Sequence, residues 1–520
     1  MSHNLEVLEN WFPAGTAEGE RALLERVFVY VDELKRVLSP RAGNPYLLVG
    51  RKGTGKSAIV EFAVKLLQLQ QVPAIILRPK DIPTSDLSDG DAMGDLKRKF
   101  YNILLSSVAS KLSESPKGIL VGDNAILYNE AVNSGNRSPD FIGRIARSLP
   151  GIAKPAIKAD LTAVYPVLTS VVAADIQRAI ANRLTDKRFH IFIDDTDQVA
   201  NPEKPGHLNR VWGLILAVRD LASEVPEICA VITLREEIWQ RLRHEGAAQR
   251  DQTDHFTNLV VRTSSSDEHV QRIIETRLRG AAAQCHSNDG LYSPFFEGQV
   301  ARAPQSPDPR SWPDLILVRS RQRPRDAIQL IAKLAEHALA EKRSPKIDEQ
   351  TFQSVMPAFS EERAILFAQE VSEEFPAAME VLRSFATANY REGGFRLAAE
   401  DAKSHLRSIT SSFRIEVYGR AMRPDRENDV FEIWRFLYNA NFLNGRISDD
   451  REKDGYRHIN ASNDPMLVTK ARWNEIQGML WEVNPAFRDF LVSRQADQKA
   501  KTGLPTRKSR LQRRASSRRD

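Results

Sequence analysis

Residues 45–57 read PYLLVGRKGTGKS, in which a short apolar run leads directly into the pattern G-x-x-x-x-G-K-S. Glycines let the backbone of such a loop point consecutive N–H groups at an anion. The apolar run at 46–49 predicts a strand, and the apolar spacing of 58–68 predicts a helix whose positive N-terminal end would face phosphates. The stretch therefore predicts a phosphate-binding loop between a strand and a helix, and with it an α/β fold built on a parallel sheet.

The loop residues have distinct expected roles in binding a nucleoside triphosphate. Lys56 is expected to reach the β- and γ-phosphates, and Ser57 is expected to ligate Mg²⁺. The alternative is a glycine-rich turn that matches the pattern by chance, but the strand and helix patterns on either side favour a real site. The predicted nucleotide-binding residues are Gly50, Arg51, Lys52, Gly53, Thr54, Gly55, Lys56, Ser57 and Ala58.

A second element of a triphosphate site is a buried strand that ends in a carboxylate. Phe189–Ile193 is a short, mostly apolar run, typical of the centre of a parallel sheet, and the acidic sequence DDTD follows it at 194–197. We assign Asp194 to Mg²⁺, and Asp195 to orienting or deprotonating the attacking water. The alternative, an acidic turn after an ordinary strand, is disfavoured by the phosphate loop upstream.

A third strand is predicted at 228–234, and polar side chains stand at its end. From there Thr233 or Arg235 could hydrogen-bond the attacking water or the γ-phosphate. Arg235 could equally pair with Glu236, with Glu237 or with a neighbouring helix. Both residues are therefore candidates for sensing the γ-phosphate.

A helix is predicted from Pro324, because proline suits a first helical turn and the residues after it form one apolar stripe. Arg325 then stands at the start of this helix, within the sequence RPRDAI. The order of these four elements resembles that of the AAA+ ATPases and their STAND-like relatives, including origin-recognition-type proteins. The resemblance implies an ATPase that uses ATP and Mg²⁺, in which Arg325 is the "sensor 2" arginine that touches the γ-phosphate from a helical lid.

Four segments are similar, more narrowly, to a group of prokaryotic P-loop ATPases. They are GRKGTGKS, IDDTD, LREEIW and WEVNPAFR, and the resemblance spans most of 17–492. The choice of ATP over GTP is implied by the resemblance, and no Asn-Lys-x-Asp motif for reading guanine is present in the sequence.

Two features depart from the AAA+ pattern. These enzymes usually place Glu after the Mg²⁺-binding Asp, whereas this chain has Asp195, which is one methylene shorter. Hydrolysis is therefore expected to be slow, unless Asp197 shares the role. No arginine finger can be assigned, because Arg219, Arg241 and Arg243 are candidates of equal merit, so the sequence does not predict a ring.

Composition indicates a globular protein of the cytosol. The chain has 520 residues, of which 42% are hydrophobic and 27% charged. It lacks a run of about eighteen apolar residues and a basic-then-apolar N-terminal segment, so neither a membrane span nor a secretory signal is predicted. Cys229 and Cys285 are too few for a disulfide framework and form no metal-ligand cluster. A cytoplasmic location would supply nucleotide and Mg²⁺.

The formal net charge of +6 is concentrated at the C-terminal end. Residues 494–520 contain ten Lys/Arg against Asp497 and Asp520, a net charge of +8, which leaves the rest of the chain near −2. This segment is too polar to bury a core and is predicted to be a disordered basic tail. It could be an arm for nucleic-acid phosphate, with salt-dependent affinity. The alternatives are a solvated, solubilising end or a contact with an acidic protein surface.

The fold class predicted from these elements is a P-loop NTPase parallel sheet of AAA+ type, with a helical lid and a winged-helix-like C-terminal domain. A helix is predicted over 17–38, and a surface loop over 134–166. The predicted parts are an N-terminal helical segment at 1–45, the ATPase core at 46–285 with a helical insertion at about 92–185, the lid at 286–375, the winged-helix-like domain at 376–492 and the tail at 493–520.

The winged-helix-like domain is predicted because helices precede two strands, at 442–447 and 455–459, that enclose a charged tip. Such domains contact DNA or protein, and acidic residues beside the basic ones in this tip weaken the case for DNA. Two functions remain open. One is a nucleotide-controlled switch in prokaryotic signalling or anti-phage defence, with a protein partner or a homo-oligomer. The other is a DNA-binding AAA+ ATPase that loads or remodels nucleoprotein complexes.

Overall fold

The computed structural model describes two compact units of the chain. The described residues are 3–501 except 14, 16–18, 41–42, 82–90, 113–172, 186, 197–206, 245–254, 264–265, 287–289, 305, 307, 322, 392–393, 453–454 and 462–463. One unit is Thr16–Thr263, and the other combines Met1–Gly15 with Ser264–Asp520. The chain therefore passes between the units at two places, and the finer division predicted from sequence stays a prediction.

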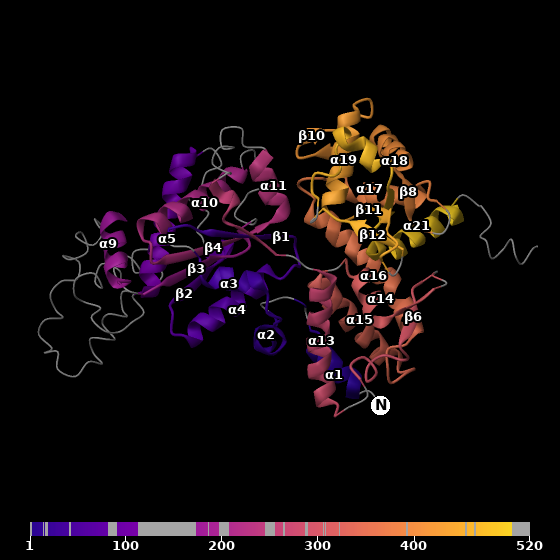
Figure 1. The fold of residues 1–520 in the computed structure, drawn as a ribbon, viewed down its shortest axis with the longest axis horizontal. Coiled ribbons are helices and arrows are strands. Elements are labelled where there is room, and N and C mark those ends of the chain that lie inside the picture. The colour runs from indigo at the N-terminus through magenta and orange to yellow at the C-terminus, as the bar shows by residue number, and fades with distance from the viewer. Residues whose placement is uncertain are drawn as a thin grey trace, which may run out of the picture. The chain divides into compact units, whose positions relative to one another are not determined.

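A five-stranded parallel sheet forms the centre of the first unit (Figure 1). Its strand order is β2-β3-β4-β1-β5, and every pairing is parallel. The strands are β1 (Tyr46–Gly50), β2 (Ala74–Leu77), β3 (Phe189–Ile193), β4 (Ile228–Arg235) and β5 (Val260–Arg262). Because β1, β4 and β3 are neighbours, their carboxyl ends bring the phosphate loop beside the predicted acidic and sensing residues.

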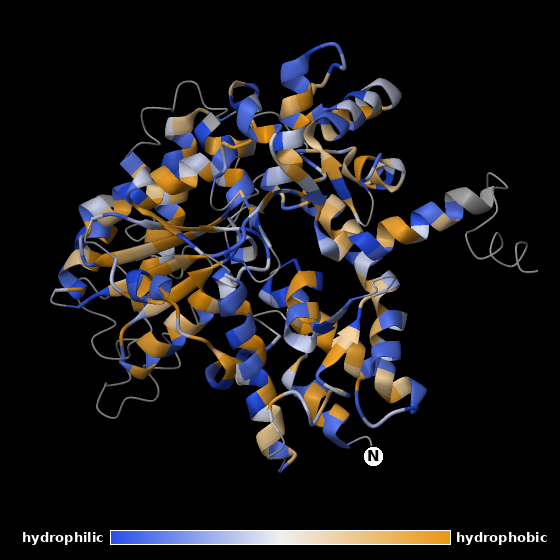
Figure 2. Ribbon diagram, turned by 45° about the vertical axis from the view of Figure 1, so that its right-hand side comes forward, coloured by the Kyte–Doolittle hydropathy of each residue, from blue (hydrophilic) through white to orange (hydrophobic). Residues whose placement is uncertain are grey.

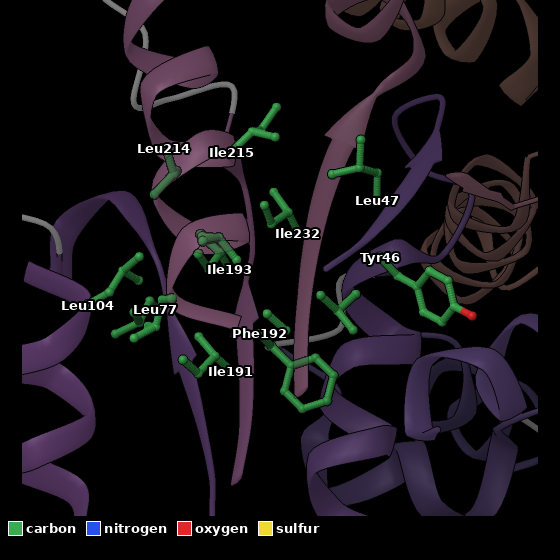
Figure 3. Close-up of a cluster of buried hydrophobic side chains, with 14 of the residues drawn as sticks. Tyr46, Leu47, Leu77, Leu104, Ile191, Phe192, Ile193, Leu214, Ile215 and Ile232 are labelled. Carbon is green, nitrogen blue, oxygen red and sulfur yellow. The ribbon is translucent and has the colours of Figure 1, made fainter. Parts of the chain in front are cut away.

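Helices cover this sheet and complete its core. They are α2 (Arg21–Val27), α3 (Asp32–Leu38), α4 (Lys56–Leu69), α5 (Met93–Leu112), α9 (Ala173–Arg183), α10 (His207–Glu224) and α11 (Glu236–His244). Side chains of β3 and β4 meet those of α5 and α10 in one buried cluster, which includes Ile193, Ile232, Leu104 and Leu214 (Figure 3). β3 is buried along its whole length, which explains why its sequence is an apolar run rather than an alternating one.

The predicted single helix over 17–38 is wrong, because the chain is extended between α2 and α3. Phe28 has φ −67° and ψ 124°, and Val31 is also extended. The break places the Phe28 ring on the Phe62 ring of α4, with centroids 4.0 Å apart. Ring stacking on the helix of the phosphate loop is a tertiary contact that the helical periodicity could not anticipate. The loop predicted at 134–166 lies outside the described residues.

The second unit begins with an N-terminal helix that packs on much later segments. It contains α1 (His3–Trp11), α13 (Asp267–Gln284), β6 (Val300–Arg302), β7 (Pro309–Ser311), α14 (Trp312–Arg319), α15 (Pro324–Glu341) and α16 (Glu349–Glu370). Helix α1 packs against α13 and α15. Trp11 lies over Gly280, where a Cβ would come within 2.1 Å of the indole ring, and its Nε1 donates to Gln284 at 3.1 Å.

The C-terminal part of this unit has the predicted winged-helix-like arrangement. Its elements are α17 (Ala378–Ser384), β8 (Arg396–Ala398), α18 (Ala399–Ser412), β9 (Glu416–Val417), β10 (Arg420–Ala421), α19 (Glu427–Asn439), β11 (Leu443–Ser448), β12 (Tyr456–Ile459), α20 (Trp473–Ile476), β13 (Leu480–Val483) and α21 (Arg488–Lys501). Strands β11 and β12 form an antiparallel hairpin in a sheet of order β12-β11-β13-β8. The predicted α/β class is confirmed, with a parallel sheet in the first unit and the predicted antiparallel hairpin in the C-terminal part of the second.

Hydrophobic residues are gathered on the strands of the five-stranded sheet in the first unit (Figure 2). Trp481 and Phe487 are fully buried in the core of the C-terminal part. Among the described residues, no helix is both long enough and apolar enough to cross a bilayer.

Candidate nucleotide-binding site

The loop between β1 and α4 has the backbone shape that an anion site needs. Gly53 and Gly55 have φ values of 82° and 94°, in the left-handed region that L side chains rarely adopt. Gly55 is the N-cap of α4, and a Cβ there would meet nothing within 4 Å. Position 55 therefore requires glycine because of its left-handed backbone conformation, and not because a larger side chain would clash. Helix α4 begins at Lys56, so its N-terminal N–H groups and positive dipole end lie at the loop.

The Lys56 ammonium is held at the loop by backbone carbonyls. Its Nζ donates to Gly50 O at 2.7 Å and to Arg51 O at 3.0 Å. A lysine ammonium is a flexible point charge, so these bonds can be exchanged for bonds to phosphate oxygens. Ser57 follows on the first turn of α4, and both side chains are half-buried.

Asp194 directly follows β3 and is 1% exposed. Its backbone N–H donates to Leu77 O at 2.9 Å, and its Oδ1 accepts a 2.7 Å hydrogen bond from the Thr233 hydroxyl. Its Oδ2 is buried, and the described part of the chain offers it no hydrogen-bond partner. A buried carboxylate oxygen of this kind is costly unless a ligand satisfies it, so Asp194 fits the Mg²⁺-linked role.

Thr233 connects the two acidic residues. Its hydroxyl donates to Asp194 and accepts from the Asp195 backbone N–H at 3.2 Å, and its carbonyl accepts from the Thr196 hydroxyl. A hydroxyl has one proton, which here goes to Asp194. The structure therefore places Thr233 where it orients the carboxylate, whereas the sequence suggested contact with the γ-phosphate or the water.

Asp195 has a left-handed backbone, with φ 55°. Asp tolerates this conformation better than most residues, at a small cost in strain. The conformation turns the chain sharply after β3, where the sequence predicted a catalytic carboxylate. Asp197, the alternative carboxylate, lies outside the described residues.

The two predicted arginines lie in different units. Arg235 ends β4 in register with Gly50 of β1, at the edge of the sheet that carries the loop. Arg325 belongs to the second unit, in the first turn of α15, where its Nε donates to Gly15 O at 3.2 Å. The structure thus brings the loop, Asp194, Asp195, Thr233 and Arg235 to one sheet edge, and Arg325 keeps its sensor role as a prediction.

Sequence reasoning missed Thr263, which follows β5. Its hydroxyl oxygen lies 2.8 Å from that of Thr54 in the phosphate loop. The only sequence signal was its place at the end of a strand-like segment.

The strand order and the glycine-rich loop together define the fold of a P-loop nucleoside triphosphatase. No family model matches the chain, and no curated protein matches it. Among solved structures it is similar to the Aeropyrum pernix ORC1 protein in complex with DNA, at 13% identity and a TM-score of 0.32, covering 96% of this chain and 98% of that one.

Two further structures are similar at the same level. Cdc6p from Pyrobaculum aerophilum has 13% identity and a TM-score of 0.34, with 90% of this chain and 98% of that chain covered. The Aeropyrum pernix ORC2 protein, in ADPNP–ADP complexes, has 12% identity and a TM-score of 0.31, with 91% and 94% covered. The assignment of the fold rests on the strand order and loop of this chain itself.

Proposed function

We propose that the chain is a Mg²⁺-dependent, ATP-binding P-loop ATPase in which hydrolysis drives a conformational switch. The observation that carries the proposal is the meeting of two features at one sheet edge. One is a left-handed glycine loop at the start of α4, and the other is the buried Asp194, whose Oδ2 lacks a partner among the described residues. Together they match the donor set and the acceptor set of a magnesium–triphosphate site.

The residues divide the work of such a site. Backbone N–H groups at the loop and Lys56 would bind phosphate oxygens, and Ser57 with Asp194 would hold Mg²⁺. Bound Mg²⁺ would offset the charge on the phosphate oxygens. Thr233 keeps Asp194 oriented through its 2.7 Å hydrogen bond. Asp195 would position or deprotonate the attacking water.

A switch, rather than a fast motor, is supported by the carboxylate at position 195. Asp reaches about one methylene less far than the Glu usual at this place in AAA+ proteins, and its backbone is already in a left-handed conformation. Slow hydrolysis lets the triphosphate state persist. We place such a switch in prokaryotic signalling or anti-phage defence, with a protein partner or a second copy of the chain as its reader.

Replacing the predicted water-orienting carboxylate should separate binding from turnover. In Asp195→Asn, we expect ATP affinity close to that of the wild type and a turnover number lower by about 100-fold or more, because a general base contributes about 10²- to 10⁴-fold. Steady-state phosphate release and an equilibrium titration with Mg²⁺-ATP measure the two quantities.

The matched control is Asp220→Asn, which neutralises a carboxylate of α10 that pairs on the surface with Lys97 at 2.7 Å. It should leave turnover unchanged. An Asp195→Asn variant that hydrolyses ATP at the wild-type rate would transfer the catalytic role to Asp197 or another group. A wild-type protein without Mg²⁺-dependent hydrolysis would refute the ATPase proposal itself.

The second candidate is a DNA-binding AAA+ ATPase that loads or remodels nucleoprotein complexes, and the β11–β12 hairpin with the basic tail favours it. In the hairpin, Arg451 and Arg457 both pair with Asp449, and Arg446 pairs with Glu482 of β13. Asp449 accepts from Arg451 Nε at 3.0 Å and lies 3.3 Å from Arg457 Nε. The hydrogen bonds from Arg451 and the charge of Arg457 hold the pKa of Asp449 below its ordinary value. Electrostatic attraction to DNA would then depend on the tail.

Removing the part of the tail that follows α21 tests this candidate. Residues 502–520 contain seven Lys/Arg against Asp520. Their deletion should weaken binding to double-stranded DNA by about tenfold or more at low salt and should flatten its salt dependence, because each lost phosphate contact releases one fewer counterion. Fluorescence anisotropy over a salt series measures both. Superimposable curves for the full chain and the deletion would limit the tail to another role.

A further inference from the structure

Thr263 contacts the phosphate loop from a position 209 residues downstream of Thr54. Its backbone N–H donates to Val49 O at 2.9 Å, which continues the β1–β5 pairing by one residue. We propose that Thr263 is a positioning residue, whose hydroxyl holds the loop in the shape that receives the triphosphate. This inference rests on the proposed ATP binding and adds a residue that acts through the loop rather than on the nucleotide.

The direction of the hydrogen bonds identifies Thr263 as the donor. The Thr54 hydroxyl donates to Arg51 O at 2.8 Å, so its single proton is committed. The 2.8 Å contact between the two hydroxyls then requires the proton of Thr263. The other acceptor within reach of Thr263, Val49 O, is 3.4 Å away. Thr54 is therefore held on one side by Thr263 while it holds Arg51 on the other.

This chain of hydrogen bonds ends at the phosphate-binding lysine. Arg51 O accepts from Lys56 Nζ at 3.0 Å as well as from Thr54. When Lys56 turns to a phosphate, Thr54 still satisfies the Arg51 carbonyl, so the turn at 51–54 need not rearrange. A loop that already has its binding conformation raises affinity, because no binding free energy is lost in ordering it.

Close packing at Gly50 gives independent support. A Cβ at Gly50 would lie 1.8 Å from Thr263 Oγ1 and 2.9 Å from Thr54 Oγ1. Gly50 is not among the glycines with positive φ. Glycine is therefore needed here because the two hydroxyls approach closely, and not because of the backbone conformation. Both threonine hydroxyls thus pack on the first glycine of the loop.

The test compares side chains that keep or lose the hydroxyl. Thr263→Val keeps the shape and removes the donor, so we expect the Kd for Mg²⁺-ATP to rise about 3- to 10-fold, the usual effect of one hydrogen bond. Thr263→Ser keeps the donor and should stay within about twofold of the wild type. Thr185→Val is the control, because its hydroxyl donates to Asn182 O on the surface of the same unit. The Tm of each variant separates binding from folding.

A double-mutant cycle distinguishes positioning from general packing. Because both hydroxyls act through one contact, Thr263→Val should change the Kd little in a Thr54→Val background. Additive effects, a wild-type Kd in Thr263→Val, or a Thr263→Ser variant as weak as the valine variant would each overturn the inference. If Thr263→Val does not fold, Thr263→Ala takes its place in the cycle.

The Lys56→Ala variant separates this inference from the proposed function. Loss of binding in Lys56→Ala with normal binding in Thr263→Val refutes only the positioning role. A wild-type protein that does not bind ATP refutes the proposed function as well.

Discussion

ATP affinity is expected to fall by about 100-fold or more in Lys56→Ala. Lys56 Nζ is held 2.7 Å from Gly50 O and 3.0 Å from Arg51 O, at the start of a helix whose N–H groups face the loop. Hydrogen bonds between charged groups contribute about 1.5–3 kcal/mol each, and bonds to two phosphates would be lost, which gives at least two factors of ten in Kd.

The fold of this variant should remain intact. Arg51 O keeps its hydrogen bond from Thr54, and the rest of α4 is unaffected. Calorimetric titration with Mg²⁺-ATP gives the Kd, and the Tm without nucleotide checks folding. Lys65→Ala is the matched control, since it removes a lysine from the same helix that pairs with Glu25 on the surface. Wild-type affinity in Lys56→Ala would refute the phosphate-binding loop.

Asp326→Asn is expected to lower the free energy of unfolding of the second unit by about 3–5 kcal/mol, the usual cost of breaking a buried ion pair. Asp326 is 3% exposed. Its Oδ1 accepts from Arg363 Nη1 and its Oδ2 from Arg321 Nε, both at 2.7 Å. An amide removes the nearest carboxylate charge from both buried guanidinium groups, because Glu370 lies 4.0 Å from Arg321 and Glu362 lies 3.4 Å from Arg363. The loss should destabilise the packing of α15 on α16.

The Asp326 carboxylate also predicts that the free energy of unfolding depends on pH in the acid range. Burial alone would raise the pKa of Asp326, but Arg321, Arg323 and Arg363 outweigh it and lower the pKa to about 2. A lowered pKa means that the stabilising contribution is complete above the ordinary value of 3.8 and is lost as the pH falls toward about 2. In Asp326→Asn, this part of the acid sensitivity should be missing.

Urea unfolding at pH 7 and pH 3, followed by tryptophan fluorescence, measures both effects. Glu362→Gln is the control, because Glu362 also pairs with Arg363, at 3.4 Å, but its side chain is 43% exposed. Its loss should change stability by less than about 1 kcal/mol. An Asp326→Asn protein as stable as the wild type at pH 7, with the same loss at pH 3, would show that the buried ion pairs do not stabilise this unit.

Much of the candidate site could be predicted because its strands are buried on both faces. β3 has the predicted bounds and β4 extends one residue further. A central parallel strand is a mostly apolar run, and an acidic residue, Asp194 or Glu236, directly follows each of these two strands. The glycine loop was predictable for a similar reason, because left-handed backbone positions require glycine. These signals depend on neighbours in the sequence and not on the rest of the fold.

Other features depend on residues far apart in the chain. The break between α2 and α3 accompanies the stacking of Phe28 on Phe62, and Trp11 of α1 lies over Gly280 of α13. Helical periodicity says which face of a segment is apolar, but not which partner will cover it. Because of such contacts, the single helix predicted over 17–38 is wrong, and the N-terminal residues belong to the second unit.

By itself, the sequence determined the fold class of this protein: the glycine-rich loop, the acid-tipped strand and the C-terminal hairpin each have a local pattern with a physical cause. Only the tertiary structure decided which hydrogen bonds form among the polar residues at the carboxyl ends of the strands. It committed the proton of Thr233 to Asp194, left Asp194 Oδ2 without a partner in the described part of the chain, and placed Thr263 against Thr54. Hydrogen bonds have direction and short range, so they are settled only when packing has brought distant strands into register.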